Sequence, residues 1–324
     1  MPTLAVTIRP YQRHDEADLV NVWNRALWCD PITVETWRAK ILLDPNFDPA
    51  TCVVAEVDGT VRGFALALTR QVPFFNEGLD PSTGWITAFG VDPDFQRQGC
   101  GTAVLNAVLT QLRELGRSKI VLGPYVPNYF TPGVDVNAYP EAVSFFGKHG
   151  FQITMRPLSM RAILTGFRIP ESLAPAYAKL EQYGIVVRPA RPDDITPVLQ
   201  FVRDHFSWDW HREATGVFQD LFAGLGDPRQ VGLMVADRDG EIVGYSQHRG
   251  ERFGPFGVRE DRRSQGIGRV LLAEILLGMR AKNLHTAWFL WTNDQAARLY
   301  AQCGFEEARR FAVMVKDIGG TGAP

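Results

Sequence analysis

Hydrophobic and polar positions follow the same order of elements twice along the chain. A short strand at 7–10 is followed by a turn with proline and aspartate and by apolar residues at helical spacing over 19–28. The same succession returns at 186–189 and 195–206. Proline and aspartate ahead of a 3.6-residue apolar period are typical of a turn that opens a helix. The pattern predicts strand, turn and amphipathic helix in both halves.

A second repeated block predicts a β-hairpin in each half. Residues 53–64 and 234–245 each place Asp-Gly between runs rich in β-branched and aromatic residues, at Asp58-Gly59 and Asp239-Gly240. Asp-Gly suits a two-residue hairpin turn, because both turn positions need positive φ. The two halves keep this order while their offset shrinks from 181 at Gly59 and Gly240 to 154 at Gly150 and Gly304. They are therefore copies with different loop lengths.

The third repeated block is a strand, a charged loop with two spaced glycines, and a long helix. The strands end in Val91 and Val258, and the helices follow the glycine loops at 99–101 and 266–268. Unpaired backbone N–H groups and the helix dipole attract anions at a helix start, and glycine lets a phosphate approach closely. Neither loop has the Gly-Lys-Ser/Thr of a Walker A motif or the third glycine of a dinucleotide fingerprint. We expect a pyrophosphate site of another kind.

Composition narrows the class of protein. The 324 residues suffice for two domains, and 45% hydrophobic with 22% charged residues is typical of a globular chain. A net charge of −2 argues against nucleic-acid binding and gives no support for membrane attachment. The beginning of the sequence has no signal-peptide pattern. The four scattered cysteines match neither a disulfide framework nor a metal site, so we expect a reduced, cytoplasmic protein without metal.

The glycine loops carry a resemblance to a known family. Gln96-Arg97-Gln98-Gly99-Cys100-Gly101 and Arg263-Ser264-Gln265-Gly266-Ile267-Gly268 resemble the coenzyme A loop of the GNAT superfamily of acyl-CoA-dependent N-acyltransferases. The segment Asn293–Phe305 is similar to the family's second signature, Asn-x-x-Ala-x-x-Leu-Tyr-x-x-x-Gly-Phe. The first half keeps only part of that signature, at 142–151.

The resemblance implies an acetyl-CoA site without a metal. In such proteins the loop amides hold the pyrophosphate, the preceding strand pairs with pantetheine, and a neighbouring parallel strand splays away to admit the thioester. Carried onto the C-terminal copy, the implied coenzyme-binding residues are Phe256, Val258, Arg263, Gln265, Gly266, Ile267, Gly268, Arg269 and Asn293. In the N-terminal copy they are Val91, Gln96, Gln98, Gly99, Gly101 and Thr102.

The resemblance also implies a general acid. Tyr300 stands where the family's tyrosine protonates the departing thiolate, whereas Phe146 occupies that position in the first copy. The C-terminal copy is therefore expected to be catalytic. The alternative interpretation of Tyr300 is an ordinary aromatic residue packed in the core. His248 and Glu251 are candidates for the base that deprotonates the amine. The alternative interpretation is that each is a solvated residue in a turn.

Two further segments have open interpretations. Trp208-Asp209-Trp210-His211 either shapes an acceptor pocket for a cationic amine or caps the core. The long loop at 124–140, rich in aromatic residues and proline, is either a functional lid or a packed structural loop.

Together these observations predict an α/β (α+β) fold of two tandem GNAT-like domains, each a mixed, mostly antiparallel sheet with flanking helices and a splayed parallel strand pair. The expected boundaries are 1–168, a linker helix at 169–183, 184–318 and a tail at 319–324. The expected activity is acetyl transfer to the primary amine of a small molecule or aminoacyl compound by a monomer or homodimer. The alternatives are a mycothiol-synthase-like tandem enzyme and a non-catalytic coenzyme A or ligand-binding protein.

Overall fold

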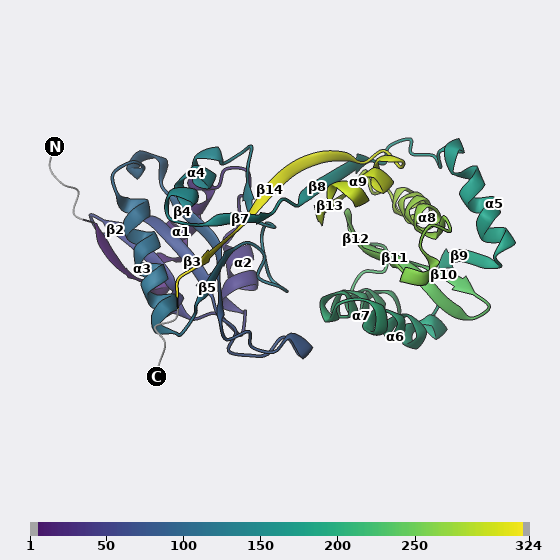
Figure 1. Ribbon diagram of the computed structural model, residues 1–324, viewed down its shortest axis with the longest axis horizontal. Helices are drawn as coiled ribbons and strands as arrows, with labels where there is room; N and C mark the ends of the chain where they lie inside the picture. Colours follow the sequence, from purple (N-terminus) through teal and green to yellow (C-terminus); the bar gives the residue numbers. More distant parts are fainter. Residues whose placement is uncertain (1–5, 320–324) are drawn as a thin grey trace. The chain divides into compact units, whose positions relative to one another are not determined.

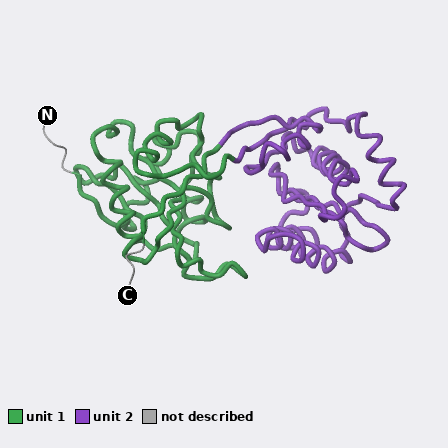
Figure 2. The backbone as a smooth tube through the Cα atoms, viewed as in Figure 1, with its two compact units in different colours: residues 1–156, 311–324 green, residues 157–310 purple. Residues whose placement is uncertain are grey.

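The computed structural model describes residues 6–319. Contacts divide the chain into two compact units (Figure 2). Unit 1 comprises residues 1–156 and 311–324, and unit 2 comprises residues 157–310. Within residues 6–319, no helix is both long and apolar enough to cross a bilayer.

Unit 1 is a sheet with helices on both faces. Its strands are β1 (Thr7–Pro10), β2 (Cys52–Val57), β3 (Thr60–Leu68), β4 (Thr83–Val91), β5 (Lys119–Leu122), β6 (Val134–Asp135), β7 (Gln152–Met155) and the last part of β14 (Glu306–Asp317). Its helices are α1 (Glu16–Ala26), α2 (Val34–Trp37), α3 (Cys100–Glu114) and α4 (Pro140–Lys148).

Alternation along the strands of unit 1 separates two apolar layers. Val53 and Ala65 face α3, where Val104 and Leu105 are fully buried. The intervening side chains, such as Val54 and Phe64, face α1 and α2 and join the core around Trp23 and Trp37. Because successive side chains of a strand point to opposite faces, the near-continuous apolar runs of β2 and β3 can fill both layers.

Unit 2 has the same plan (Figure 1). Its strands are β8 (Leu158–Ile163), β9 (Ile185–Pro189), β10 (Val231–Arg238), β11 (Glu241–Arg249), β12 (Arg252–Val258), β13 (Thr286–Thr292) and the first part of β14. Its helices are α5 (Ala174–Gln182), α6 (Ile195–His205), α7 (Trp208–Phe222), α8 (Ile267–Ala281) and α9 (Asp294–Ala301). The α6–α7 layer covers one face of the sheet and α8 the other.

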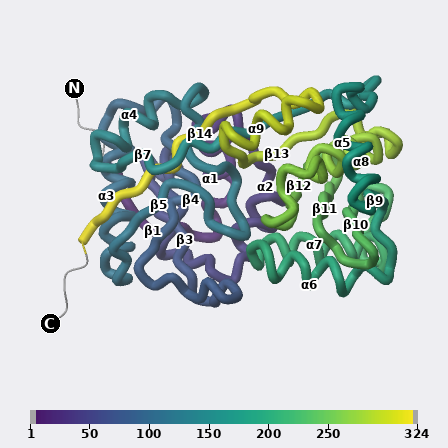
Figure 3. Tube along the Cα trace, turned by 45° about the vertical axis from the view of Figure 1, so that its right-hand side comes forward, coloured from purple at the N-terminus to yellow at the C-terminus, as the bar shows by residue number. Residues whose placement is uncertain are grey.

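The two copies exchange their last strands. In unit 2, β8 from the first copy pairs with β13 on one side and with Glu306–Arg310 of β14 on the other. In unit 1, residues 313–317 of β14 lie between β5 and β7. Figure 3 shows β14, in yellow, running beside β7 and β5. Each compact unit therefore contains a strand from the other copy.

The exchange explains why the compact units do not follow the expected domain boundaries. The repeat suggested boundaries at 168/169 and 183/184, whereas the chain passes between units at 156/157 and 310/311. The expected linker helix at 169–183 contains α5, which belongs to unit 2. A repeat in sequence locates a copy, but strand pairing determines which unit the strand joins.

Other expectations from the sequence are confirmed. Both hairpins form, and all four turn residues have positive φ: 51° and 76° at Asp58 and Gly59, 52° and 88° at Asp239 and Gly240. The helices expected at 19–28 and 195–206 are α1 and α6. The α/β class with mixed, mostly antiparallel sheets and one parallel pair in each copy is also observed, at β4–β5 and at β12–β13.

The parallel pairs separate after a few residues. The β4–β5 pairing runs from Thr83–Lys119 to Ile86–Leu122, and β4 then continues to Val91 without β5 beside it. In unit 2, only Arg252 and Trp288 are paired between β12 and β13. A bulge lies in the antiparallel pairing on the other side of β4 and of β12, at matching positions. These wedges are the splayed pairs that the resemblance implied.

Candidate active site

The two glycine loops have the same backbone geometry. Gly99 and Gly266 precede the first turns of α3 and α8 with φ of 87° and 93°. Two residues earlier, Arg97 and Ser264 also have positive φ, 60° and 67°. Such a turn points successive backbone N–H groups toward the helix start, where the helix dipole favours an anion. Both loops therefore have the form expected of a pyrophosphate site.

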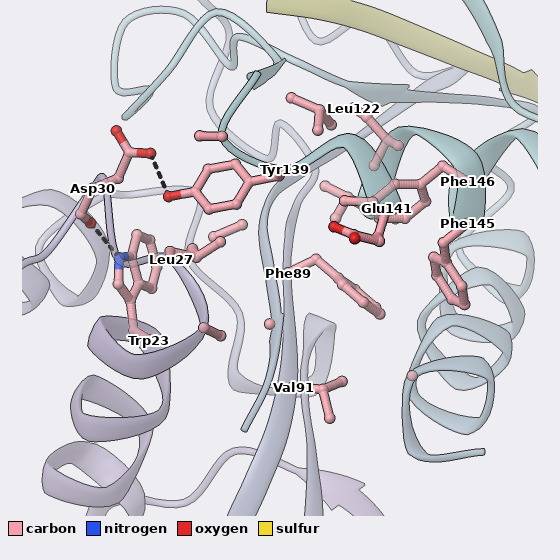
Figure 4. Close-up of a pocket in the computed structure, with 18 of the residues that line it drawn as sticks. Trp23, Leu27, Asp30, Phe89, Val91, Leu122, Tyr139, Glu141, Phe145 and Phe146 are labelled. Atoms are coloured by element: carbon pink, nitrogen blue, oxygen red, sulfur yellow. Dashed lines mark hydrogen bonds between the residues drawn. The ribbon is translucent and has the colours of Figure 1, made fainter. Parts of the chain in front are cut away.

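A cavity of about 1090 Å³ opens at the glycine loop of unit 1. We call it the N-terminal cavity. Its walls are the end of α1, the splayed part of β4, the end of β5, the loop before α4, and α4 itself. Figure 4 shows Phe89 at its centre, with Phe145 and Phe146 on one side and Tyr139 with Asp30 on the other. The cavity therefore extends from the glycine loop through the gap beside β4.

Most coenzyme residues expected in the first copy line this cavity. They are Val91, Gln96, Gly99, Gly101 and Thr102. Gln98 is not part of the lining, and its Nε2 donates to the Asp94 carbonyl at 3.0 Å. The Gln96 amide turns back to donate to the Val91 carbonyl at 3.0 Å, which ties the loop to the end of β4.

A buried carboxylate holds the approach to this loop. Asp92 is fully buried and accepts hydrogen bonds from the Asp94 N–H at 3.1 Å and from Arg25 Nη1 at 3.0 Å. Arg25 also contacts the Asp94 carboxylate at 2.7 Å, and Arg62 contacts Asp92 at 3.3 Å. Because burying an unpaired carboxylate is very unfavourable, these partners fix the turn between β4 and α3.

The end of the cavity away from the glycine loop was not predicted from the motifs. We call it the acceptor end and define it by Trp23, Trp28, Asp30, Phe130 and Tyr139. The Tyr139 hydroxyl donates to Asp30 Oδ2 at 3.0 Å and accepts from the Cys29 N–H at 3.0 Å. Burial, reinforced by the Asp30 carboxylate, raises the pKa of Tyr139, so this side chain is a neutral phenol.

The long loop at 124–140 supplies part of this end. Phe130, Thr131, Gly133 and Tyr139 come from it and line the cavity, so this insertion forms part of the cavity wall. Its aromatic composition was the sequence signal. Asp30 and Glu141 had no such signal, because a single acidic residue beside a helix is most often solvated surface.

The C-terminal copy places Tyr300 among aromatic rings. Its ring centroid lies 4.5 Å from that of Phe289, 5.7 Å from Phe305 and 6.1 Å from Phe256. Burial raises the pKa of the Tyr300 hydroxyl, which makes proton donation harder. The surroundings match a packed core tyrosine as well as a general acid.

Bulky side chains also occupy the flank of β12. The Phe206 ring lies against the backbone of Gly257 and stacks on Trp210 at 4.8 Å. Trp210 packs with the apolar core of the α6–α7 layer, which corresponds to the core-capping interpretation of the tryptophan segment. In unit 1 the matching Gly90 lies against the Phe64 ring and against Ala26, and Ala26 lines the cavity. The neighbour that comes from the end of the preceding helix is therefore small in the first copy and large in the second.

Two features distinguish the C-terminal copy from the N-terminal copy, one at the glycine loop and one at the bulge of β12. Helix α5 packs against it: Ala176 Cβ lies 3.1 Å from a Cβ built at Gly266, and Lys179 donates to the Ser264 carbonyl at 3.2 Å. At the bulge, Pro255 stands where the N-terminal copy has Ala88. Because proline has no backbone N–H, the C-terminal bulge has one fewer amide donor.

The remaining coenzyme residues expected in the C-terminal copy have varied surroundings. Arg269 is exposed, Ile267 is buried, and Arg263 lies 3.6 Å from the Glu260 carboxylate. Gln265 Oε1 is buried and has no hydrogen-bond partner among residues 6–319. Phe256 and Val258 face Gly268. Asn293 caps α9 by accepting from the Ala296 N–H at 2.9 Å.

Both base candidates have local structural bonds. His248 is buried, its Nδ1 lies 3.0 Å from the Gly250 carbonyl, and burial lowers its pKa to about 4. Glu251 accepts from the Thr286 hydroxyl at 2.6 Å and from the N–H groups of His285 and Thr286 at 3.0 Å. The Thr286 bond lowers the pKa of Glu251. The Glu251 contacts anchor the start of β13, and the His248 contact closes the turn between β11 and β12.

No group of histidine, cysteine, aspartate or glutamate side chains in the described part of the chain is suited to hold a metal ion.

Comparison with solved structures supports the tandem architecture. The glucosamine N-acetyltransferase region of a fungal multi-domain GH3 β-N-acetylglucosaminidase matches 97% of this chain and 38% of its own, with a TM-score of 0.76 and 19% identity. A GCN5-related N-acetyltransferase from Sphaerobacter thermophilus matches 97% of this chain and 96% of its own, with a TM-score of 0.64 and 18% identity. A tandem GNAT protein from the clavulanic acid biosynthesis pathway matches 98% of this chain and 100% of its own, with a TM-score of 0.63 and 13% identity. These likenesses concern the fold.

Sequence comparison points to the same family. The mycothiol acetyltransferase of Sanguibacter keddieii is 33% identical over 113 residues, which are 35% of this chain and 31% of that protein. The matched segment thus spans less than a third of that relative's length. The acetyltransferase (GNAT) family model matches residues 20–151, and the acetyltransferase (GNAT) domain model matches residues 229–307. The chain belongs to the GNAT acetyltransferase family as a tandem, two-copy member and is an acyltransferase.

Proposed function

We propose that the protein transfers an acetyl group from acetyl-CoA to the primary amine of a small molecule, and that the N-terminal cavity holds both substrates. The observation that carries the proposal is the continuity of this cavity. A single space of about 1090 Å³ joins the glycine loop, the splayed end of β4 and an end with polar and aromatic side chains. A donor and an acceptor can therefore meet there.

The residues of the N-terminal cavity fit the donor. The amides around Gly99, Gly101 and Thr102 would hold the pyrophosphate, with the Arg97 side chain beside them. The free edge of β4 up to Val91 would pair with the pantetheine arm, and Phe89, Phe145 and Phe146 would enclose its apolar part. Backbone N–H groups at the β4 bulge are available to stabilise the oxyanion of the acetyl carbonyl.

This proposal moves the active copy from the C-terminal half, which the motifs favoured, to the N-terminal half. Phe146 has no proton to give, so the N-terminal cavity would work without the family's tyrosine. The thiolate would then take its proton from the attacking nitrogen or from solvent. Direct attack by the amine needs no covalent intermediate on the protein.

A second candidate keeps the reaction in the C-terminal copy with Tyr300 as general acid. It is supported by the matching geometry of the Gly266 loop and by the buried, unpartnered Oε1 of Gln265, which is available to a ligand. The likeness to the mycothiol acetyltransferase supports an amine acceptor of that kind in either copy. The four free cysteines agree with a reduced, cytoplasmic setting.

Product formation tests the proposed function. The purified protein is incubated with acetyl-CoA and a panel of primary amines, and free thiol and acetylated amine are measured together. Equal amounts of both products support acetyl transfer. Coenzyme binding without product from any amine would instead favour the non-catalytic, ligand-binding alternative.

A further inference from the structure

The N-terminal cavity has opposite charge preferences at its two ends. Its titratable lining side chains are Arg25, Asp30, Arg97, Tyr139 and Glu141. Arg97 lies at the glycine loop, where the backbone also favours an anion. Asp30 lies at the acceptor end, and Glu141 lies on the first turn of α4. The remaining cation, Arg25, is paired with Asp92 and Asp94.

We infer that the acceptor is a cationic primary amine without a neighbouring carboxylate or phosphate, and that Glu141 is the catalytic base that deprotonates it. The inference rests on the proposed function, because it needs the donor to occupy the same cavity. It goes further by naming the charge of the acceptor and the residue that takes its proton.

The surroundings of Glu141 suit a base. Glu141 is an exposed residue that lines the cavity, and its carboxylate makes no hydrogen bond or ion pair with any residue in 6–319. Figure 4 shows it projecting between Tyr139 and Phe146, beside Phe89. Phe146 is the residue at the family's tyrosine position. Glu141 lies on the first turn of α4, two residues after Tyr139 of the acceptor end, whereas Phe146 lies more than one turn further along the helix. A base for the incoming amine is expected on that side.

Asp30 and Tyr139 serve as positioning residues. The Tyr139 hydroxyl is fixed by its bonds to Asp30 and to the Cys29 N–H, and the Trp23 indole donates to the Asp30 carbonyl at 2.8 Å. The Trp28 and Tyr139 rings meet edge to face at 6.3 Å, and Trp23 and Phe130 do so at 4.7 Å. Ring faces next to a carboxylate attract an ammonium group. A second anion on the acceptor would face Asp30 and Glu141. The lining cations are Arg97 at the glycine loop and Arg25, which is paired with Asp92 and Asp94; Lys40 lies 4.5 Å from the centre of the Phe130 ring but is not part of the lining.

The proton balance is complete without any further reactant. Glu141 takes one proton from the ammonium group, and the nitrogen lone pair then forms the bond to the acetyl carbonyl carbon. As the carbon–sulfur bond breaks, the sulfur leaves with the second proton of that nitrogen. The products are the amide, the free thiol and a protonated Glu141, which returns its proton to solvent.

Matched amines test the charge preference by binding. Tyramine and tyrosine differ by one carboxylate, and each is titrated calorimetrically into the protein saturated with coenzyme A. We expect tyramine to bind at least about tenfold more tightly than tyrosine, because the tyrosine carboxylate is repelled by Asp30 and Glu141, and Asp30→Asn to remove most of that difference. Equal binding of the two amines, or binding of neither, overturns the inference.

The pH profile tests the role of Glu141. With the best acceptor of the amine panel, Glu141→Gln should lower kcat/KM about 100-fold near neutral pH. It should approach the unmodified protein at high pH, where the amine is already deprotonated. The matched control is Glu114→Gln at the exposed end of α3. A uniform loss at every pH, or the same profile for both variants, overturns the role.

Measuring coenzyme A binding distinguishes a failure of the proposed function from a failure of the inference about Glu141 and acceptor charge. If the unmodified protein does not bind coenzyme A in this cavity, the proposed function fails, and the inference fails with it. If coenzyme A binds and an amine is acetylated, but neither Glu141 nor acceptor charge matters, only the inference fails. Glu141→Gln should bind coenzyme A normally, which also shows that this variant is folded.

Discussion

The Tyr139 hydroxyl lies 3.0 Å from Asp30 Oδ2, although the two residues are 109 positions apart in the chain. This bond joins the segment after α1 to the residue before α4, and both residues line the N-terminal cavity. Tyr139 is the last residue but one of the insertion at 124–140, so the inserted loop supplies a polar aromatic side chain to the acceptor end. The second copy is shorter here and has no such loop.

Tyr139→Phe should weaken acceptor binding and leave the donor unaffected. The substitution removes one hydrogen bond to Asp30 and one from Cys29, so we expect unfolding to become easier by about 1–3 kcal/mol. The acceptor KM should rise several-fold, because the Asp30 carboxylate loses its hydrogen bond from the Tyr139 hydroxyl. Steady-state kinetics and coenzyme calorimetry check this, with exposed Tyr183→Phe as control. An unchanged KM would contradict the role of the bond.

Tyr300→Phe should have little effect on acetyl transfer. The hydroxyl lies among aromatic rings, and no residue in 6–319 forms a hydrogen bond with it. Removing it should therefore change the free energy of unfolding only slightly. Initial rates at saturating acetyl-CoA provide the measurement. A drop of 100-fold or more would return the active site to the C-terminal copy, with Tyr300 as its general acid.

The exchanged strand β14 should contribute strongly to the stability of unit 1. Phe311 is fully buried in β14, so Phe311→Ala should destabilise the protein by about 3–5 kcal/mol. Asp317→Ala, at an exposed position of the same strand, should have little effect. Denaturant unfolding followed by circular dichroism measures both.

Fragments test the same exchange more broadly. A chain of residues 1–168 lacks the strand that lies between β5 and β7, and residues 169–324 lack β8. Each fragment alone should fail to give a cooperative unfolding transition, whereas co-expression should restore a folded pair. Two independently folded fragments would contradict the exchange.

Acid should weaken the protein through a repeated ion pair. Arg188 donates to both oxygens of Asp194 at 2.6 and 2.9 Å, and this contact holds the Asp194 pKa below its ordinary value. Arg9 and Asp15 form the same pair in the first copy, at 2.7 Å. A carboxylate with a lowered folded-state pKa stabilises the fold above its unfolded value of about 4, and that contribution is lost as the pH falls below it.

Asp194→Asn should therefore cost about 1–3 kcal/mol at neutral pH and little at pH 2–3. Thermal unfolding across this pH range measures the difference. The control is Asp193→Asn, which changes an exposed neighbouring carboxylate. A constant difference between Asp194→Asn and the unmodified protein at every pH would show that the ionised carboxylate is not the cause.

Local patterns predicted much of the fold. Positive φ at Asp58-Gly59 and Asp239-Gly240 follows from the chemistry of the turn itself, and the glycine loops follow from the need to open a helix after a strand. These features depend on neighbouring residues only. The last strands could not be assigned to a unit, because β8 and β14 carry no motif that names a partner strand, and tertiary packing determines the pairing.

Part of the candidate site was predictable because some of its residues belong to a local sequence motif. Val91, Gln96, Gly99, Gly101 and Thr102 carry a motif with a fixed spacing. The C-terminal motif is more complete, but side chains far from it in sequence decide whether a cavity forms there. Phe206 against Gly257 and α5 against Gly266 are tertiary contacts that no motif encodes.

The location of the coenzyme is the central claim, and matched charge changes test it most directly. Thr102 and Arg269 occupy the same exposed position in the first turns of α3 and α8. An acid there is favourable for the helix by about 0.3–1 kcal/mol, so Thr102→Glu and Arg269→Glu should both fold. Either glutamate would repel a pyrophosphate bound at its own loop.

Calorimetric titration with coenzyme A gives the answer. We predict one coenzyme per chain for the unmodified protein and for Arg269→Glu, and binding weakened at least about tenfold in Thr102→Glu, as expected for an added like charge beside the phosphates. Unchanged binding in Thr102→Glu together with its loss in Arg269→Glu would contradict the account and place the coenzyme in the C-terminal copy.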